Sequence, residues 1–238
     1  MINNYSCINI YENKKKNSKL SSQILYGEKF SIISKYRNWY KIKTDYDKYI
    51  GFIKRKKFKD FTYKPTHKVS SLKADVFSKP SKNSKIMMKL SFTSLLQVKS
   101  NQKDFLNFDK YWIKKSDVVP INYKQKIFKK ITIFKNVKYK WGGKKFDGID
   151  CSGLVQLFYK FNNLYCPRDT GPQFKYFKKF KSIKKGAIIF WKGHVAICLS
   201  KNKLIHAYGP RKKVVIMDIK KTINLIKKTA KLDVIGIK

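Results

Sequence analysis

The chain has 238 residues, which suits one large domain or two to three small ones, and its 42% hydrophobic content is ample for packed cores. Its formal net charge of +42 raises the question of a nucleic-acid partner, whereas the absence of any run of about 18 apolar residues argues against a membrane-spanning helix. The N-terminus lacks the basic, apolar and cleavage regions of a signal peptide, so we expect a cytoplasmic protein.

The basic residues are spread evenly along the chain and are nearly all lysines. Successive quarters (1–60, 61–120, 121–180 and 181–238) carry 15, 12, 14 and 15 of them, and only four of the 56 are arginine. Base readout and bidentate phosphate contacts favour arginine, so this distribution indicates a solvated surface rather than a nucleic-acid site. We therefore expect no nucleic-acid partner.

A repeat occupies the first half of the chain. The stretch at 8–20 (INIYENKKKNSKL) aligns without gaps with the stretch at 74–86 (ADVFSKPSKNSKI), with the tripeptide Asn-Ser-Lys in common. Each copy continues in short alternating apolar stretches separated by Lys, Asn, Asp and Ser turns, a pattern typical of small β-barrels. We therefore predict two all-β domains, at 1–62 and 63–122.

The remaining residues, 123–238, change pattern and predict an α+β domain. Apolar spacing predicts one helix over 123–135 and a second helix beginning at Cys151, with Gln156, Lys160 and Asn163 on its polar face. A loop and a short helix should follow in CPRDTGPQF. Four strand-like stretches come next (GAIIFW, HVAICLS, KLIHAY and VVIMDI), and a late helix is predicted within INLIKKTAKL.

Cys151 lies at the turn that leads into the second helix, in the stretch YKWGGKKFDGIDCSG. A helix N-terminus presents unpaired N–H groups and partial positive charge, which should favour the thiolate and lower the pKa of the thiol. The glycines let the chain turn tightly, and the backbone N–H of Cys151 would face an oxyanion forming on an attacked carbonyl. No two cysteines have the C-x-x-C spacing of a zinc site, so no metal is expected.

A thiol nucleophile needs a base, and the chain has three histidines. His67 lies in a linker, whereas His194 and His206 lie in two consecutive strand-like stretches. In a hairpin, His206 can bond one nitrogen of His194 while the other nitrogen faces Cys151, which is the arrangement of nucleophile, base and orienting residue. On spacing alone, the alternative is a buried core cysteine and two ordinary strand histidines.

The quoted stretches resemble a known family. YKWGGKKFDGIDCSGLVQ, then GHVAICLS and LIHAYGP, are similar to the NlpC family of papain-like cell-wall cysteine peptidases. QILYGEKF and NWYKIKTDYDKYIGFI resemble the first of two bacterial SH3-like domains that precede this catalytic domain in one branch. That branch comprises gamma-D-glutamyl-L-diamino acid endopeptidases. The resemblance therefore implies hydrolysis of peptides released from peptidoglycan, with no cofactor.

The resemblance also implies roles for individual residues. Cys151 would be the nucleophile, His194 the base and His206 the orienting residue, with Tyr139 helping at the oxyanion site. For Tyr139, the alternative is a core aromatic residue.

In the same branch, the free amine of the N-terminal L-Ala of the substrate is bound by an Asp, a Ser and a Tyr. Here these would be Asp150, Ser152 and Tyr49, with Tyr46 as the competing choice for the tyrosine. A carboxylate pairs with an ammonium, and an amine held at a fixed distance from the thiol makes the enzyme count residues from the end of the peptide.

Several alternatives remain open at this point. Asp150 also suits the N-cap of the helix, a role compatible with substrate binding. Arg168, in RDTGPQ, is placed with the substrate-binding residues, and its alternative is a structural ion pair with Asp169. The whole chain could instead be another amidase or acyltransferase on the same fold, or a non-catalytic SH3-like protein that binds wall polymer or nucleic acid. The sequence does not determine whether the diamino acid that leaves is lysine or diaminopimelate. It also does not determine the oligomeric state.

Overall fold

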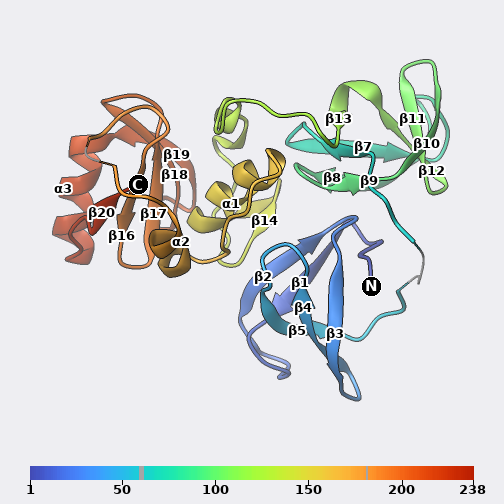
Figure 1. Ribbon diagram of the computed structural model, residues 1–238, viewed down its shortest axis with the longest axis horizontal. Coiled ribbons are helices and arrows are strands. Elements are labelled where there is room, and N and C mark those ends of the chain that lie inside the picture. Colours follow the sequence, from blue (N-terminus) through green and yellow to red (C-terminus); the bar gives the residue numbers. More distant parts are fainter. Residues whose placement is uncertain (59–61, 181) are drawn as a thin grey trace. The chain divides into compact units, whose positions relative to one another are not determined.

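The structure, a computed structural model, describes residues 1–58, 62–180 and 182–238. It divides into two compact units (Figure 1). The first comprises residues 1–124 with 161–163, and the second comprises residues 125–160 with 164–238. Among the described residues, none of the helices has the length and apolarity that crossing a bilayer requires.

The first unit begins with a five-stranded antiparallel sheet in the order β2-β1-β5-β4-β3. Alternating residues of its strands point inward, as in β1 where Ile8 and Ile10 are buried between half-buried neighbours, and they pack with Ile24, Phe30 and Ile42. The strands are β1 (Cys7–Tyr11), β2 (Leu20–Leu25), β3 (Phe30–Lys35), β4 (Trp39–Thr44) and β5 (Ile50–Lys54).

The same arrangement recurs in the second half of this unit. Its sheet has the order β8-β7-β12-β11-β10, which repeats the order of the first sheet strand for strand. The strands are β7 (Lys73–Phe77), β8 (Ile86–Ser91), β10 (Val98–Gln102), β11 (Phe105–Phe108) and β12 (Tyr111–Lys114). The aligned stretches at 8–20 and 74–86 run from β1 to the start of β2 and from β7 to the start of β8, so the sequence repeat is a structural repeat.

A small sheet and a buried lysine complete the first unit. The sheet has the order β13-β6-β9, from β13 (Val118–Pro120), β6 (His67–Val69) and β9 (Leu95–Leu96), and the short helix η1 (Lys115–Asp117) precedes β13. On β6, Lys68 is only 1% exposed. Its Nζ donates to the backbone oxygens of Tyr123 and Phe161 and to Asn163 Oδ1. Burial lowers the pKa of Lys68 to about 8. Three oxygen atoms accept hydrogen bonds from its ammonium group, which has three N–H donors.

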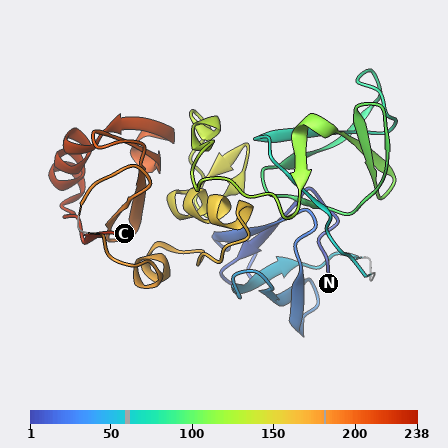
Figure 2. The same ribbon diagram turned by 45° about the horizontal axis from the view of Figure 1, so that its top comes forward.

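The second unit combines a sheet with the helices α1 and α2. α1 (Cys151–Phe161) and α2 (Thr170–Tyr176) are joined by an extended segment (Figure 2). Before α1, a glycine-rich turn forms the pair β14 (Lys144–Lys145) and β15 (Gly148–Ile149). The turn and α1 together position Cys151.

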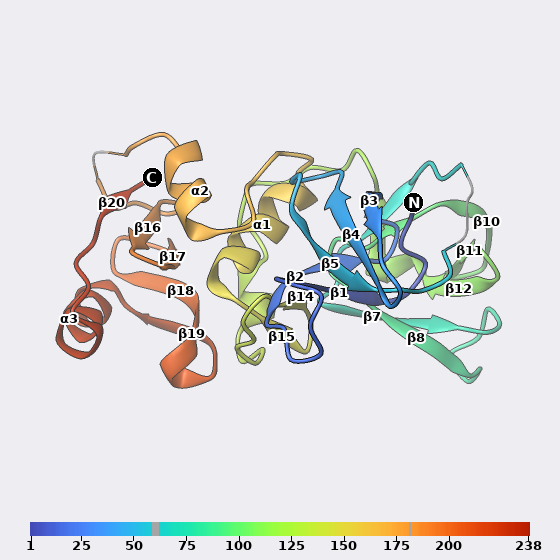
Figure 3. The ribbon, with the colours of Figure 1, turned by 90° about the horizontal axis from the view of Figure 1, so that it is seen from below.

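The sheet of this unit has five antiparallel strands in the order β19-β18-β17-β16-β20, and α3 (Ile219–Ala230) packs on it (Figure 3). Ile219 and Ile226 of α3 contact a core that includes Ile189, Trp191 and Leu204. The remaining elements are β16 (Ile188–Trp191), β17 (His194–Cys198), β18 (Lys203–Tyr208), η3 (Gly209–Arg211), β19 (Lys213–Asp218) and β20 (Gly236–Ile237).

Two features differ from the sequence prediction. The helix predicted over 123–135 is wrong, because only the single 3-10 turn η2 (Ile131–Phe134) forms there, with left-handed residues at Phe128 and Asn136. The predicted polar face of the second helix is also wrong for two of its three residues, whereas the third, Asn163, is exposed. Gln156 is 1% exposed and donates to the backbone oxygen of Cys166, and Lys160 is 8% exposed, so both residues are buried.

Candidate active site

The thiol of Cys151 lies at the first residue of α1, where the residue is only 6% exposed. The preceding Asp150 caps the helix, since its Oδ1 accepts a 2.7 Å hydrogen bond from the backbone N–H of Gly153. Its Oδ2 accepts a 2.8 Å bond from the N–H of Gly142, whose positive φ of 70° favours glycine. A Cβ at Gly153 would lie 2.7 Å from the backbone oxygen of Gly143. The sequence motif is therefore a tight turn closed around one carboxylate.

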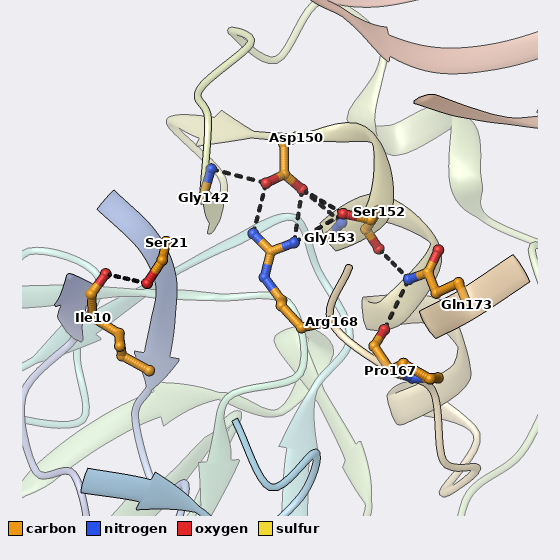
Figure 4. A network of polar contacts seen from close by, with 9 residues as sticks. All are labelled: Ile10, Ser21, Gly142, Asp150, Ser152, Gly153, Pro167, Arg168 and Gln173. Carbon is orange, nitrogen blue, oxygen red and sulfur yellow. Dashed lines mark hydrogen bonds and ion pairs between the residues drawn. The ribbon is translucent and has the colours of Figure 1, made fainter. Parts of the chain in front are cut away.

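Arg168 completes this turn from the segment between α1 and α2, and Figure 4 shows its guanidinium facing the Asp150 carboxylate. The two side chains form a bidentate pair, Nη2 to Oδ2 at 2.6 Å and Nη1 to Oδ1 at 3.0 Å. Nη1 also donates to Ser152 Oγ at 3.0 Å. The described ion pair of Arg168 is thus with Asp150, the residue that caps α1.

Asp150, which is predicted to bind the substrate amine, already accepts several hydrogen bonds from the protein. An ionised carboxylate has about four acceptor positions, and Asp150 accepts two bonds from Arg168 and one each from Gly142 and Gly153. Ser152 Oγ adds a longer contact of 3.4 Å. The N-cap role is therefore directly visible, whereas contact of Asp150 and Ser152 with a substrate stays a prediction.

Gln173 is a supporting residue that the sequence analysis did not single out. It lies on α2, is fully buried, and its Nε2 donates to the backbone oxygens of Ser152 at 3.0 Å and of Pro167 at 2.9 Å (Figure 4). It therefore ties the first turn of α1 to the segment that carries Arg168. The signal for it was its place at the end of RDTGPQ, the stretch that begins with Arg168.

The two histidines of the predicted triad come together on neighbouring strands. His194 begins β17 and His206 lies within β18, and their Nε2 and Nδ1 atoms are 2.9 Å apart. The pairing of Ile197 with Ile205 places His206 opposite Ala196, so both histidines lie on the same face of the sheet. This leaves Nδ1 of His194 for the thiol.

His206 is held more firmly than His194. It is fully buried, and its ring stacks on that of Tyr208 at 4.6 Å with an interplanar angle of 10°. Its Nε2 lies 3.4 Å from Met217 Sδ on β19. Neither Tyr208 nor Met217 was singled out from the sequence. Tyr208 lies two residues after His206 on the same strand, whereas Met217 reaches His206 through the pairing of β18 with β19.

The thiol contacts the start of β17. Backbone N–H groups of Val195, next to His194, and of Ser152 are hydrogen-bonded to the Cys151 sulfur and favour its thiolate. Burial acts in the opposite direction and is stronger, and with the Asp150 charge it raises the pKa of Cys151 to about 12. The pKa lowering expected from the helix N-terminus is therefore wrong for the resting site.

Burial also lowers the pKa of His194 to about 4, and burial together with His194 lowers that of His206 to about 3. Both imidazoles are therefore neutral at neutral pH, and the resting site holds a neutral thiol beside a neutral base. A neutral His194 that accepts a proton at Nδ1 carries its own proton on Nε2 and donates it to His206.

Tyr139 lies beside this site. Burial raises the pKa of its phenol, and the charges of Cys151 and Asp150 raise it further, which places the ring near the thiol. A bridge from Tyr139 to Ile149 and a 2.8 Å bond from its N–H to the backbone oxygen of Lys212 fix its backbone.

Tyr49 belongs to the first unit, between β4 and β5, where its N–H donates to Thr44 Oγ1 at 2.8 Å. It packs against the core of the first sheet. The predicted contact of Tyr49, or of Tyr46, with the substrate amine stays a prediction.

Comparison with known proteins agrees with this geometry. Residues 136–230 match the NlpC/P60 family, and residues 10–58 match the bacterial dipeptidyl-peptidase SH3 domain. The gamma-D-glutamyl-L-lysine dipeptidyl-peptidase of Bacillus subtilis (strain 168) is 26% identical over 234 residues, covering 86% of this chain and 77% of the relative. The protein of the same name from Bacillus cereus is 25% identical over 240 residues, covering 85% of this chain and 71% of its own.

Solved structures share the fold over the whole chain. A crystal structure of an NlpC/P60 family protein from Bacillus cereus superposes with a TM-score of 0.83 at 19% identity, covering 100% of this chain and 98% of that one. The family match covers the turn, the helix α1 and the strands that carry the cysteine and both histidines. Residues 136–230 are therefore an NlpC/P60 cysteine peptidase domain, preceded by a bacterial dipeptidyl-peptidase SH3 domain at residues 10–58.

Proposed function

We propose that this cysteine peptidase cleaves the bond between gamma-D-glutamate and a diamino acid in peptidoglycan-derived peptides that have a free N-terminal L-Ala. The observation that supports the chemistry best is the 2.9 Å contact between His194 and His206, beside a thiol that is hydrogen-bonded to the next residue, Val195. The substrate class is supported by the names of the two Bacillus relatives.

The resting protonation states determine the first step. Because both Cys151 and His194 are neutral, His194 acts as a general base and takes the thiol proton as the sulfur attacks the gamma-carbonyl carbon of D-glutamate. The carbonyl oxygen becomes an oxyanion, for which the Cys151 N–H and the Tyr139 phenol are the proposed donors.

The remaining steps use the same histidine. The tetrahedral intermediate collapses by breaking the C–N bond, and the diamino acid leaves as an amine that receives its proton from His194. The thioacyl-enzyme is then hydrolysed by a water molecule that His194 deprotonates, which releases L-Ala-D-Glu and restores the thiol.

Within the second unit, Asp150 and Ser152 are the proposed ligands of the free amine of L-Ala. The carboxylate of Asp150 already accepts four short bonds. An ammonium would therefore bind it as an additional charge-assisted contact, in place of the 3.4 Å contact from Ser152 Oγ, which is the weakest one present. The released hydroxyl still accepts the 3.0 Å bond from Arg168.

A cleavage assay by mass spectrometry tests the proposal. The protein is incubated with L-Ala-gamma-D-Glu-diaminopimelate, with the same peptide acetylated at its amine, and with Cys151→Ala protein as a control. We expect L-Ala-D-Glu from the free peptide only, and none from the control. Cleavage of neither peptide, or undiminished cleavage by the control, would overturn the proposed function.

A second candidate is an amidase of the same fold that does not require the amine, and the full set of donors already around Asp150 favours it. It predicts equal cleavage of the free and the acetylated peptide. The same assay therefore separates the two functions.

A further inference from the structure

A pocket of about 540 Å³ in the second unit opens beside the catalytic histidine. His194 and Tyr139 form one side of it, and Leu225 and Thr229 of α3 form another. Lys192 and Arg211 complete its edge, from the turn before β17 and from η3. The pocket therefore adjoins the catalytic base directly, although no step of the proposed mechanism uses it.

The position of the pocket assigns it to the leaving group. None of the residues expected to hold the substrate amine in this unit, Asp150, Ser152 and Arg168, lines it. Those residues surround Cys151 on the acyl side, whereas His194 protonates the amine that leaves. The part of the substrate beyond the scissile bond therefore extends from His194 into this pocket.

In the part of the chain that the structure describes, the pocket is lined by basic side chains and by no acidic ones. Lys192 and Arg211 are both exposed, and within the described residues their side chains have no hydrogen bond or ion pair. Neither Asp nor Glu occurs among the residues that line this described pocket. A ligand that ends in an ammonium alone would be repelled there, and one that carries an extra carboxylate would be attracted.

Arg211 is informative because arginine is rare in this chain, at four of 56 basic residues. Arg168, which is another of the four, binds a carboxylate in two-pronged geometry within the same unit. The guanidinium of Arg211 has the same planar fork and no carboxylate of the described chain to bind. Leu225 and Ile226, which also line the pocket, offer apolar surface for the methylene chain of a diamino acid.

We propose that this pocket binds the leaving diamino acid and selects one whose side chain ends in a carboxylate as well as an amine, as in diaminopimelate, over lysine. The inference rests on the proposed function and extends it, because the two Bacillus relatives are named for lysine. Lys192 and Arg211 are its specificity residues, and the second carboxylate is the group that they recognise.

The test compares kcat/KM for L-Ala-gamma-D-Glu-diaminopimelate and L-Ala-gamma-D-Glu-L-lysine. We expect wild-type protein to prefer the diaminopimelate peptide about tenfold, a preference that 0.5 M NaCl reduces because the ion pairs are exposed. Arg211→Gln and Lys192→Gln should each reduce the ratio several-fold. Arg37→Gln, which removes an exposed arginine from the first unit, is the matched control and should keep the wild-type ratio.

The outcomes distinguish this inference from the proposed function. If neither tripeptide is cleaved, the proposed function fails. If both are cleaved at equal rates, or if Arg211→Gln and Lys192→Gln leave the ratio unchanged, the peptidase stands and the role of the pocket is refuted. A lysine peptide cleaved faster than the diaminopimelate peptide would also refute it.

Discussion

Arg168 and Asp150 form an ion pair that is almost completely shielded from water. Their side chains are only 1% and 8% exposed, and the closest atoms are 2.6 Å apart. The pair joins the residue that caps α1 to the segment that precedes α2, so one contact fixes the turn that carries the nucleophile to that segment.

Replacement of Arg168 by methionine should therefore lower the free energy of unfolding of the protein. The change leaves the buried Asp150 carboxylate without its cation, which costs on the order of 3–5 kcal/mol in the free energy of unfolding. Urea denaturation of the wild-type and Arg168→Met proteins measures this change in the free energy of unfolding. Lys227→Met is the matched control, because its pair with Asp233 is 66% and 74% exposed and should contribute less than about 1 kcal/mol. Equal effects of the two substitutions would contradict the structural role of the buried pair.

The raised pKa of Cys151 predicts slow alkylation at neutral pH. Because only the thiolate reacts and the pKa is about 12, the rate with iodoacetamide should keep rising about tenfold per pH unit between pH 7 and pH 10. Mass spectrometry of the Cys151 peptide measures the rate, with N-acetylcysteine as the reference thiol. A rate that levels off near pH 7 would show a resting thiolate–imidazolium pair instead.

The pH profile of kcat/KM should have its acidic limb near pH 4. His194 must be neutral to act as a base, and burial lowers its pKa from 6.5 to about 4, so it remains a base at pH 5. Initial rates between pH 3.5 and 8 test this expectation. A midpoint near 6.5 would mean that the histidine is solvated in the working enzyme.

The same histidines should make stability depend on pH. Their pKa values are lower in the folded than in the unfolded chain, so the unfolded chain binds more protons once the pH falls below 6.5. Stability should therefore decrease as the pH falls from 6.5 towards 4. Urea midpoints measured at pH 7 and pH 5 should show this decrease, and it should be smaller in His206→Asn protein.

Lys68→Met should destabilise the first unit. The substitution keeps the length of the side chain but leaves the backbone oxygens of Tyr123 and Phe161 and the Asn163 amide without their buried donor, at a cost of about 2–4 kcal/mol. Thermal or urea unfolding measures the change. Lys64→Met, at an exposed lysine shortly before β6, should be close to neutral.

The sequence predicted best where the signal is local. The repeat aligned β1 with β7, and the motif around Cys151 placed the first residue of α1. The short turn between the stretches HVAICLS and KLIHAY also predicted a hairpin that brings His194 next to His206, and the two rings are in contact.

The errors arose where tertiary contacts decide. Apolar spacing could not reveal that Phe128 and Asn136 adopt left-handed conformations that interrupt a helix. Nor could it reveal that Gln156 finds a buried carbonyl partner at Cys166. The pKa of Cys151 was predicted from the helix end alone, whereas its burial depends on how the whole domain closes around it.

The contact between His206 and Met217 determines where the chain of acid–base groups stops. A thioether accepts a hydrogen bond weakly and takes up no proton, so His206 Nε2 faces a partner that can neither supply nor remove one. The proton taken from the thiol therefore cannot pass through the two imidazoles into the protein. It stays on His194 until it is transferred to the departing amine. In each catalytic cycle the two histidines therefore hold only this one additional proton.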